Sequence, residues 1–279
     1  MTDVTRSGPG RPSRVVGPDP AAEPVASTAV CGRFVSSSSA ADLASYFGAE
    51  GVPEETLDQS WNVAPTNDVF VVHADGGVRR IDAFHWGLVP VWAKDPKVGS
   101  RMINARSETL ATKGAFKPAF KKRRCIIPAD GFYEWRKVPG QKQKQPYFIH
   151  RTDEEPYAFA GLWELWKGPD RSGDEQLRST TIITTTPNES MAEIHDRMPV
   201  ILPPSAWDEW LDPGNDDIDT LGRLLVPAPA QLTVLRPVGT GVNHVRNKGA
   251  ELIEEVEPPA TLEDAAATDA APTDGDATS

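Results

Sequence analysis

The feature that most restricts the fold of this chain is a series of short apolar segments, each bounded by a turn rich in glycine, proline or aspartate. Segments of this length and composition are typical of β-strands, and turns with glycine can adopt the positive φ that tight hairpins require. Three pairs of such segments flank turns of this kind: 68–73 with 78–85, 124–135 with 146–150, and 157–166 with 180–186. The pattern predicts three hairpins in a mainly antiparallel sheet.

Short helices are predicted between these strands. The clearest covers 40–47, with Ser39 as its N-cap and Gly48 as its stop. Further short helices are predicted at 107–113, 188–195 and 205–211. Hairpins with interspersed short helices predict an α+β fold with a mainly antiparallel, barrel-like β core and short flanking helices.

The two ends of the chain differ in composition from the region between them. Residues 1–29 are rich in Pro, Gly, Ser, Ala and Arg, and residues 258–279 consist mostly of Ala, Asp, Thr and Pro. Neither end has enough apolar surface to offset the entropy of ordering it. We therefore expect a disordered extension over 1–30, one globular domain over 31–257, and a disordered acidic tail over 258–279.

Several classes of protein are excluded by what the chain lacks. It has no run of eighteen apolar residues and no secretory signal near its start, so we expect a cytoplasmic protein without a membrane partner. It has two cysteines, no Cys-x-x-Cys pair and five scattered histidines. We therefore expect no disulfide, no metal site and no cofactor.

The charge is unevenly distributed along the chain. The formal net charge is −11, but residues 251–279 hold nine acids and no base, which leaves −2 for the rest. Residues 101–151 hold thirteen Lys or Arg against three acids. This basic run is typical of a surface that binds nucleic-acid phosphates, and a merely solvated basic face is the alternative.

Five short segments contain more polar and aromatic residues than a core requires: 31–34, 61–65, 104–109, 124–135 and 195–199. Taken singly, their residues have ordinary explanations. Cys31 could be a small buried hydrophobe, Asn104 a turn former, Glu134 a solvent-facing strand residue and His195 a helix end.

Taken together, the five segments resemble the SOS response-associated peptidase family, also called the abasic site processing proteins. The resemblance runs from Cys31 to about Glu255 and includes Trp86-Gly87 and the late Asn243-x-x-x-Asn247 stretch. It implies an α+β, barrel-like domain that is both catalytic and DNA-binding. It also implies a reactive Cys31 that becomes N-terminal when everything before it is removed, with the site completed by the following residues: Asn104, Glu134 and His195.

An N-terminal cysteine suits the capture of an abasic site, whose ring-opened sugar is an aldehyde. Its α-amine is roughly a tenth to a fifth unprotonated at pH 7 and can form an imine. Its thiol can then close a thiazolidine ring intramolecularly. We expect Glu134 to act as general acid and base, His195 to shuttle a proton during opening of the sugar ring, and Asn104 to orient the amine or a sugar hydroxyl.

The expected partner is single-stranded DNA that contains an abasic site, bound by a monomer that associates with the nucleoid. The three arginines of the motifs would hold phosphates, and Pro65 and Trp92 would stack on or wedge between bases, although Trp92 could also be an ordinary core residue. The predicted DNA-binding residues are Arg33, Asn62, Pro65, Trp92, Arg106, Ser107, Thr109, Lys113, Lys117 and Arg197.

The family pattern begins Met-Cys-Gly-Arg, whereas thirty residues precede Cys31 in this sequence. An amide nitrogen cannot form an imine. We expect that translation starts at Val30, which stands where the family has Met, because the valine codon GTG can initiate translation. The alternative is that the chain cleaves itself before Cys31, with the thiol attacking the preceding carbonyl.

Two other functions are compatible with the same residues. A conventional cysteine peptidase would use Cys31 with His195 as its base, and a non-covalent module would bind single-stranded DNA without forming an adduct.

Overall fold

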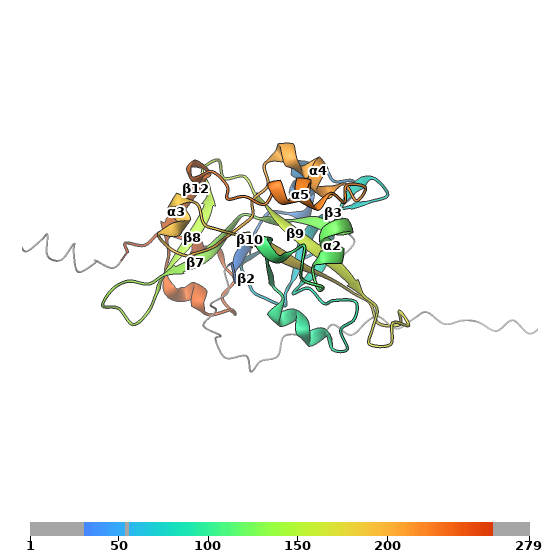
Figure 1. The fold of residues 1–279 in the computed structure, drawn as a ribbon. Helices are drawn as coiled ribbons and strands as arrows, with labels where there is room; N and C mark the ends of the chain where they lie inside the picture. Colours follow the sequence, from blue (N-terminus) through green and yellow to red (C-terminus); the bar gives the residue numbers. More distant parts are fainter. Residues whose placement is uncertain (1–30, 54–55, 259–279) are drawn as a thin grey trace, which may run out of the picture.

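The structure of the chain is a computed structural model that describes residues 31–53 and 56–258. The disorder predicted for 1–30 and 259–279 falls outside the described residues. Within them the fold is α+β, as predicted, and strands dominate (Figure 1). No helix in this part of the chain is long and apolar enough to cross a membrane.

Five strands close into a barrel. Each strand pairs with the next in the order β10, β4, β3, β6, β9, and β9 pairs again with β10. The hairpins predicted from 68–85 and 157–186 are both present, as β3 with β4 and β9 with β10. The junction of β4 with β10 is parallel, so the barrel is not wholly antiparallel. The strands are β3 (Asp68–Asp75), β4 (Val78–Trp86), β6 (Arg124–Ala129), β9 (Tyr157–Trp166) and β10 (Leu177–Thr185).

A second, antiparallel sheet lies beside the barrel (Figure 1). Its strand order is β12-β8-β7-β1-β2, and it contains the third predicted hairpin as β7 with β8. The strands are β1 (Phe34–Ser36), β2 (Ser60–Val63), β7 (Gly131–Arg136), β8 (Gln145–Arg151) and β12 (Thr233–Pro237).

The prediction of one continuous strand over 124–135 is wrong, because the chain leaves the barrel as β6 and enters the second sheet as β7. Asp130 forms the break, and its carboxylate accepts hydrogen bonds from the backbone N–H groups of Ser37 and Ser38 at 2.6 and 2.9 Å. Gly131 follows, where a Cβ would lie 2.3 Å from the ring of Phe148. The bend carries Glu134 out of the barrel and into the second sheet.

Two very short strands flank the carboxyl end of β10. β5 (Asn104–Arg106) runs parallel to it, with Asn104 opposite Ile182. β11 (Met198–Pro199) runs antiparallel to its last two residues. The segments that carry Asn104 and His195 are therefore brought to the same end of one barrel strand.

The helices are short, and only one was predicted with its full bounds. α1 (Ala40–Phe47) has Ser39 as N-cap and ends at Gly48, whose φ is +61°. Of the helix predicted over 107–113 only a single 3-10 turn forms, at 107–109, where the side chain of Glu108 pairs with Arg197. α3 stops three residues before His195. The remaining helices are α2 (Lys117–Lys122), α3 (Glu189–Ala192), α4 (Trp207–Leu211) and α5 (Ile218–Arg223). The 3-10 turns are η1 (Pro96–Arg101), η2 (Ser107–Thr109), η3 (Pro204–Ala206), η4 (Ala230–Leu232), η5 (Thr240–Asn243) and η6 (Ala250–Ile253).

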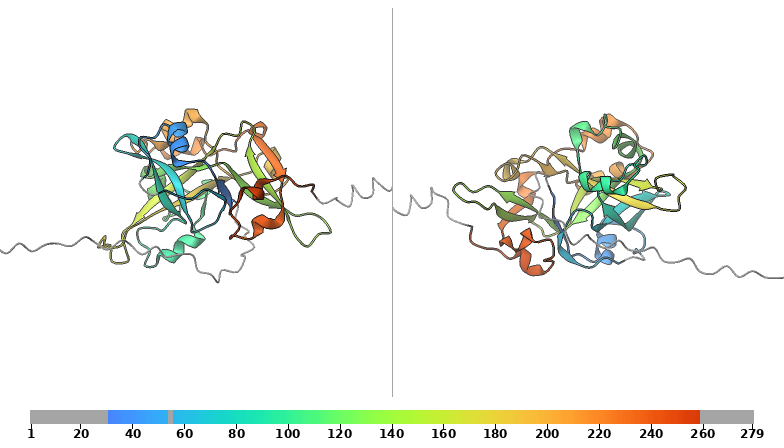
Figure 2. Two further views of the ribbon diagram at one scale, coloured as in Figure 1. Left: turned by 180° about the vertical axis from the view of Figure 1, so that it is seen from behind. Right: turned by 90° about the horizontal axis from the view of Figure 1, so that it is seen from below.

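Two apolar clusters join these parts. One packs α1, α2, α4 and α5 against the barrel and includes Phe47, Phe120 and Trp210. The other lies between the barrel and the second sheet and includes Phe34 and Cys31. In the views of Figure 2 the barrel and the second sheet remain side by side. Burial of Cys31 between them places the predicted nucleophile at the junction of the two sheets.

Candidate active site

The site begins with a direct contact between Cys31 and Glu134. The backbone nitrogen of Cys31 donates a hydrogen bond of 2.5 Å to Oε1 of Glu134. Cys31 lies three residues before Phe34, the first residue of β1, and its φ of +50° is in the left-handed region. The nitrogen atom that would be the α-amine of an N-terminal cysteine therefore already lies against a carboxyl group.

Glu134 is a buried residue of β7 and is only 3 % exposed, so the reading of it as a solvent-facing strand residue is wrong. Burial raises the pKa of Glu134 to about 8, against the lowering effects of its hydrogen bond from Cys31 and the charge of Lys144. Asp196 adds to the rise. A carboxyl group with this pKa can give or take a proton near neutral pH.

The thiol of Cys31 is fully buried. Burial raises its pKa well above the ordinary value, and the charge of Glu134 raises it further. The thiol therefore stays protonated at neutral pH, which is the opposite of what a thiolate nucleophile needs.

His195 lies between α3 and β11. Its Nδ1 is 2.8 Å from Oδ1 of Asp196 and 3.2 Å from the backbone nitrogen of Arg197. One nitrogen cannot satisfy both at once. Nδ1 accepts from the Arg197 amide in the tautomer that carries its proton on Nε2, and it donates to Asp196 in the forms that carry a proton on Nδ1. Burial lowers the pKa of His195, with Lys144 and Arg197 acting in the same direction and Asp196 opposing them. The neutral ring predominates at pH 7.

Lys144 and Asp196 were missed by the sequence analysis. Both act electrostatically on Glu134 and on His195, so the two predicted catalytic residues share one electrostatic environment. Asp196 lies in the segment 195–199, and Lys144 lies in the basic run over 101–151. Neither position carried a signal that distinguished it from its neighbours. Asn104 is half-buried at the same end of β10.

The predicted DNA-binding residues fall into two groups. Arg106, Lys113 and Lys117 are exposed, and Trp92 is 56 % exposed, which rules out the core reading of that tryptophan. Pro65, Ser107 and Thr109 are half-buried. These side chains are accessible to a bound strand.

The other group is engaged within the protein. Asn62 is fully buried, and its amide donates to the backbone oxygens of Val242, His244 and Asn247. Arg33 donates through Nη1 to Oδ1 of Asn62 at 2.9 Å. These two residues hold the C-terminal segment, residues 242–247, against the second sheet. The burial of Asn62 does not allow its side chain to contact DNA directly.

Arg197 is likewise engaged by protein groups. Its guanidinium forms a two-pronged ion pair with Glu108 and hydrogen bonds to Thr184.

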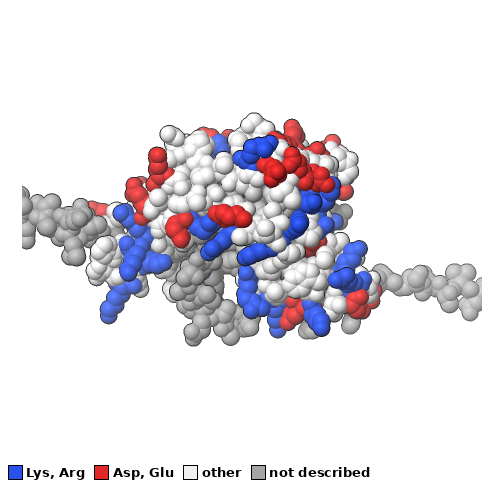
Figure 3. Space-filling view, in the orientation of Figure 1, with Lys and Arg blue, Asp and Glu red and all other residues white. Residues whose placement is uncertain are grey.

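The basic run is partly structural. Arg124 is 3 % exposed and donates to four backbone oxygens, including those of Trp210 and Phe120. Arg123 pairs with Glu164, and Arg151 with Asp153. On the face that Figure 3 shows, most Lys and Arg side chains lie in the lower half and over the hairpin of β7 and β8. Fewer residues of the basic run are therefore available to bind phosphates than the thirteen Lys and Arg in the sequence suggested.

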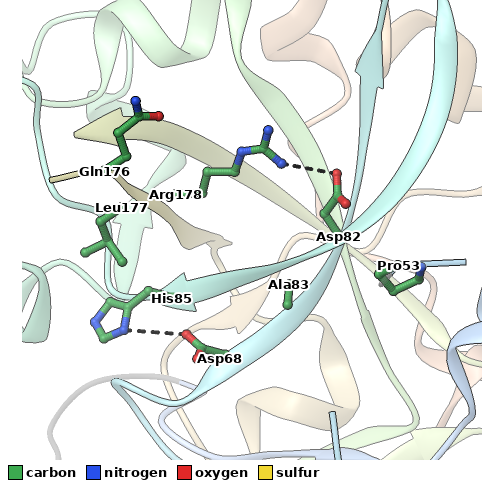
Figure 4. A pocket seen from close by; sticks show the side chains of 8 residues that line it. All are labelled: Pro53, Asp68, Asp82, Ala83, His85, Gln176, Leu177 and Arg178. Atoms are coloured by element: carbon green, nitrogen blue, oxygen red, sulfur yellow. Dashed lines mark hydrogen bonds and ion pairs between the residues drawn. The ribbon is translucent and has the colours of Figure 1, made fainter. Parts of the chain in front are cut away.

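A separate pocket of about 490 Å³ opens at the amino end of β10 (Figure 4). Arg178 meets Asp82 at 3.3 Å there, and His85 faces Asp68 at 3.9 Å. None of the predicted site residues lines it. The described residues also contain no group of three or more His, Cys, Asp or Glu side chains that could hold a metal ion.

Comparison with known proteins identifies the family. Residues 30–245 match the family model described as SOS response associated peptidase (SRAP). The chain is 44 % identical to the abasic site processing protein YoqW of Bacillus subtilis, over 81 % of this chain and 99 % of that protein. It is 34 % identical to the abasic site processing protein YedK of Escherichia coli, over 81 % of this chain and 100 % of that protein.

The fold also matches a crystal structure of a protein from Bacteroides thetaiotaomicron. The TM-score is 0.72 at 24 % identity, covering 81 % of this chain and 100 % of that one. This likeness shows the fold. The family match and the two relatives show that the chain belongs to the SOS response associated peptidase family.

Proposed function

We propose that this protein processes abasic sites by capturing them covalently in single-stranded DNA through Cys31, in a form in which the amine of Cys31 is free. The observation that carries the proposal is the 2.5 Å contact between the Cys31 nitrogen and Glu134, a carboxyl group whose pKa burial raises to about 8. The relatives named abasic site processing proteins support it. We propose residues 31–257 as the functional unit.

A free amine beside Glu134 forms a coupled pair that shares one proton. The pair can exist as ammonium and carboxylate, or as neutral amine and carboxylic acid. Burial disfavours the separated charges and so favours the neutral pair. This is the reactive form, because only a neutral amine attacks an aldehyde and only a protonated carboxyl can donate its proton.

The amine nitrogen first adds to the C1′ aldehyde of the ring-opened sugar and forms a carbinolamine. Glu134 then protonates the hydroxyl group of this intermediate, which leaves as water, and the nitrogen lone pair forms the iminium. The carboxylate that results lies beside the new iminium and stabilises its charge.

The thiol of Cys31 closes the ring. Its sulfur adds to the iminium carbon, the electrons of the C=N bond return to nitrogen, and Glu134 takes the thiol proton. The raised pKa of the thiol suits this order, because the proton leaves only as the C–S bond forms. Amine, thiol and aldehyde give a thiazolidine and one water, and Glu134 ends in the protonation state in which it began.

His195 and Asn104 would act on the sugar. In the neutral tautomer whose Nδ1 donates its proton to Asp196, at 2.8 Å, Nε2 of His195 can take the proton of the sugar hydroxyl during ring opening, and Asp196 then stabilises the imidazolium. Asn104 would orient the sugar from the other side of β10. Trp92, with its exposed ring, would stack on a base next to the lesion.

A conventional cysteine peptidase is less well supported. It needs a histidine that activates the thiol and a lowered thiol pKa, whereas burial raises the pKa of Cys31 and its nitrogen contacts a glutamate.

The proposal is tested with protein that is folded as the full chain and then cleaved at a protease site placed directly before Cys31. It is incubated with single-stranded oligonucleotides that contain either one abasic site or none. A denaturation-resistant adduct with the lesion alone, abolished in Cys31→Ala, is the expected result. Binding without an adduct would favour a non-covalent module, and hydrolysis of a peptide without an adduct would favour a peptidase.

A further inference from the structure

Arg197 forms a side-chain bridge across the carboxyl end of β10. Its Nη1 and Nη2 donate to Oε1 and Oε2 of Glu108 at 2.9 and 3.0 Å. Nη2 also donates to the backbone oxygen of Thr184 at 2.7 Å, and Nε reaches the Thr184 hydroxyl at 3.3 Å. All three nitrogens of the guanidinium thus donate to Glu108 or Thr184.

The bridge joins the two segments that carry the proposed sugar-facing residues. Glu108 lies in η2, directly after the strand that begins with Asn104. Arg197 lies two residues after His195 and directly before β11. β5 and β11 pair with β10 along only three and two residues, respectively. Their backbone ladders are short, so a side-chain tie adds substantially to what fixes their relative position.

The ion pair between Arg197 and Glu108 is of a kind that restricts movement. A bidentate arginine–carboxylate pair constrains orientation as well as distance. The hydrogen bonds from Arg197 lower the pKa of Glu108, so the carboxylate remains charged over the pH range in which the protein would act. The Arg197 side chain is only 13 % exposed, which limits its alternatives.

We propose that Glu108 is a positioning residue that acts through Arg197 to hold Asn104 and His195 in register on the two sides of β10. The inference rests on the proposed function for its kinetic consequence, since Asn104 and His195 matter as a pair only if they act on one substrate. Glu108 itself touches no reacting atom.

The expected kinetic effect is on rate and not on affinity. Glu108→Gln keeps the size of the side chain but loses the charge, so the two segments can shift relative to each other. Small misplacements of catalytic groups are costly, and we expect the rate of adduct formation at saturating DNA to fall about 10-fold or more. The affinity for undamaged single-stranded DNA should not fall, because a negative charge has been removed from the surface.

The test compares four proteins, each folded as the full chain and cleaved before Cys31. They are the unmodified protein, Glu108→Gln, Arg197→Gln and the double variant. If Glu108 acts through Arg197, its substitution costs nothing further in the Arg197→Gln background. The matched control is Asp153→Asn, which removes the carboxylate from the bidentate pair with Arg151 after β8. The control should leave the rate unchanged.

Amide hydrogen exchange of the uncleaved full chain supplies a readout that does not depend on the reaction. Glu108→Gln should accelerate exchange both at 103–109 and at 195–199, whereas a merely local role would affect the first segment alone. Unchanged exchange at 195–199, or additive losses of rate in the double variant, would overturn the inference. If the unmodified protein forms no adduct, the proposed function fails, and exchange at 195–199 still decides whether the bridge positions that segment.

Discussion

Replacement of Glu134 by glutamine separates the two roles of this side chain. Glutamine has nearly the same shape, and its Oε1 can still accept the 2.5 Å hydrogen bond from the Cys31 nitrogen. It cannot donate a proton to a leaving hydroxyl group or accept one from the thiol. The variant should therefore bind DNA normally and fail at the dehydration and ring-closure steps.

The size of the effect follows from the protonation state of Glu134. With a pKa of about 8, the group is mostly in the acid form at neutral pH; a group with that pKa is about 90 % protonated at pH 7 and about 10 % at pH 9. Loss of a positioned general acid and base costs about 10²–10⁴-fold in rate. The rate of the unmodified protein should rise with pH as the amine loses its proton and fall again above pH 8 as Glu134 ionises.

The assay is a single-turnover time course of adduct formation on denaturing gels from pH 6 to pH 10, with affinity measured separately on undamaged DNA. Glu164→Gln is the matched control, because Glu164 is also a buried strand carboxyl whose pKa burial raises. It lies on β9 outside the site and pairs with Arg123, which follows α2. It should keep the full rate and the full pH profile.

Two results would refute this reasoning. One is a rate for Glu134→Gln close to that of the unmodified protein. The other is a reduced rate whose decline above pH 8 persists in the variant, since that decline would then belong to another group.

Three further predictions concern stability and DNA binding. Asn62→Ala should lower the free energy of unfolding by about 2–4 kcal/mol in chemical denaturation, because three backbone oxygens lose the donor they share, and a loss near zero would contradict the docking role. Because the folded-state pKa of Glu134 is raised from 4.5 to about 8, its contribution to stability is fully present below pH 4.5 and is lost as pH rises through 8. The stability of Glu134→Gln should therefore depend less on pH over that interval, by up to about 1.4 kcal/mol per pH unit, and parallel curves would contradict the raised pKa. Lys117→Ala should reduce the salt dependence of binding to single-stranded DNA by about 0.7 in the log–log slope, and an unchanged slope would remove Lys117 from the interface.

The hairpins were predictable because their information is local. The apolar run over 69–72 and the glycines at Gly76 and Gly77 specify β3 with β4 without reference to the rest of the chain. Ser39 and Gly48 likewise fix both ends of α1. The break at Asp130 was not predictable, because its cause is a pair of hydrogen bonds from serines more than ninety residues earlier in the chain. The parallel junction of β4 with β10 is equally non-local.

For the candidate site, residue types were predictable and surroundings were not. The motifs indicated Cys31 and Glu134, yet their contact spans 103 positions of sequence and appears only when β7 leaves the barrel. Asn62 and Arg33 were predicted to contact DNA because they are polar and lie in motifs. Their partners are in the C-terminal segment, which no local pattern connects to them.

The mass of the adduct tests the central claim most directly. Protein cleaved before Cys31 is reacted with an abasic oligonucleotide, and a second sample is acetylated at the Cys31 amine before the reaction. If the amine and thiol of one residue capture the aldehyde, the adduct weighs one water less than the sum of its parts, contains no free thiol at Cys31, and does not form in the acetylated sample. Equal trapping by the acetylated protein, or by the full chain with residues 1–30 retained, would contradict the account.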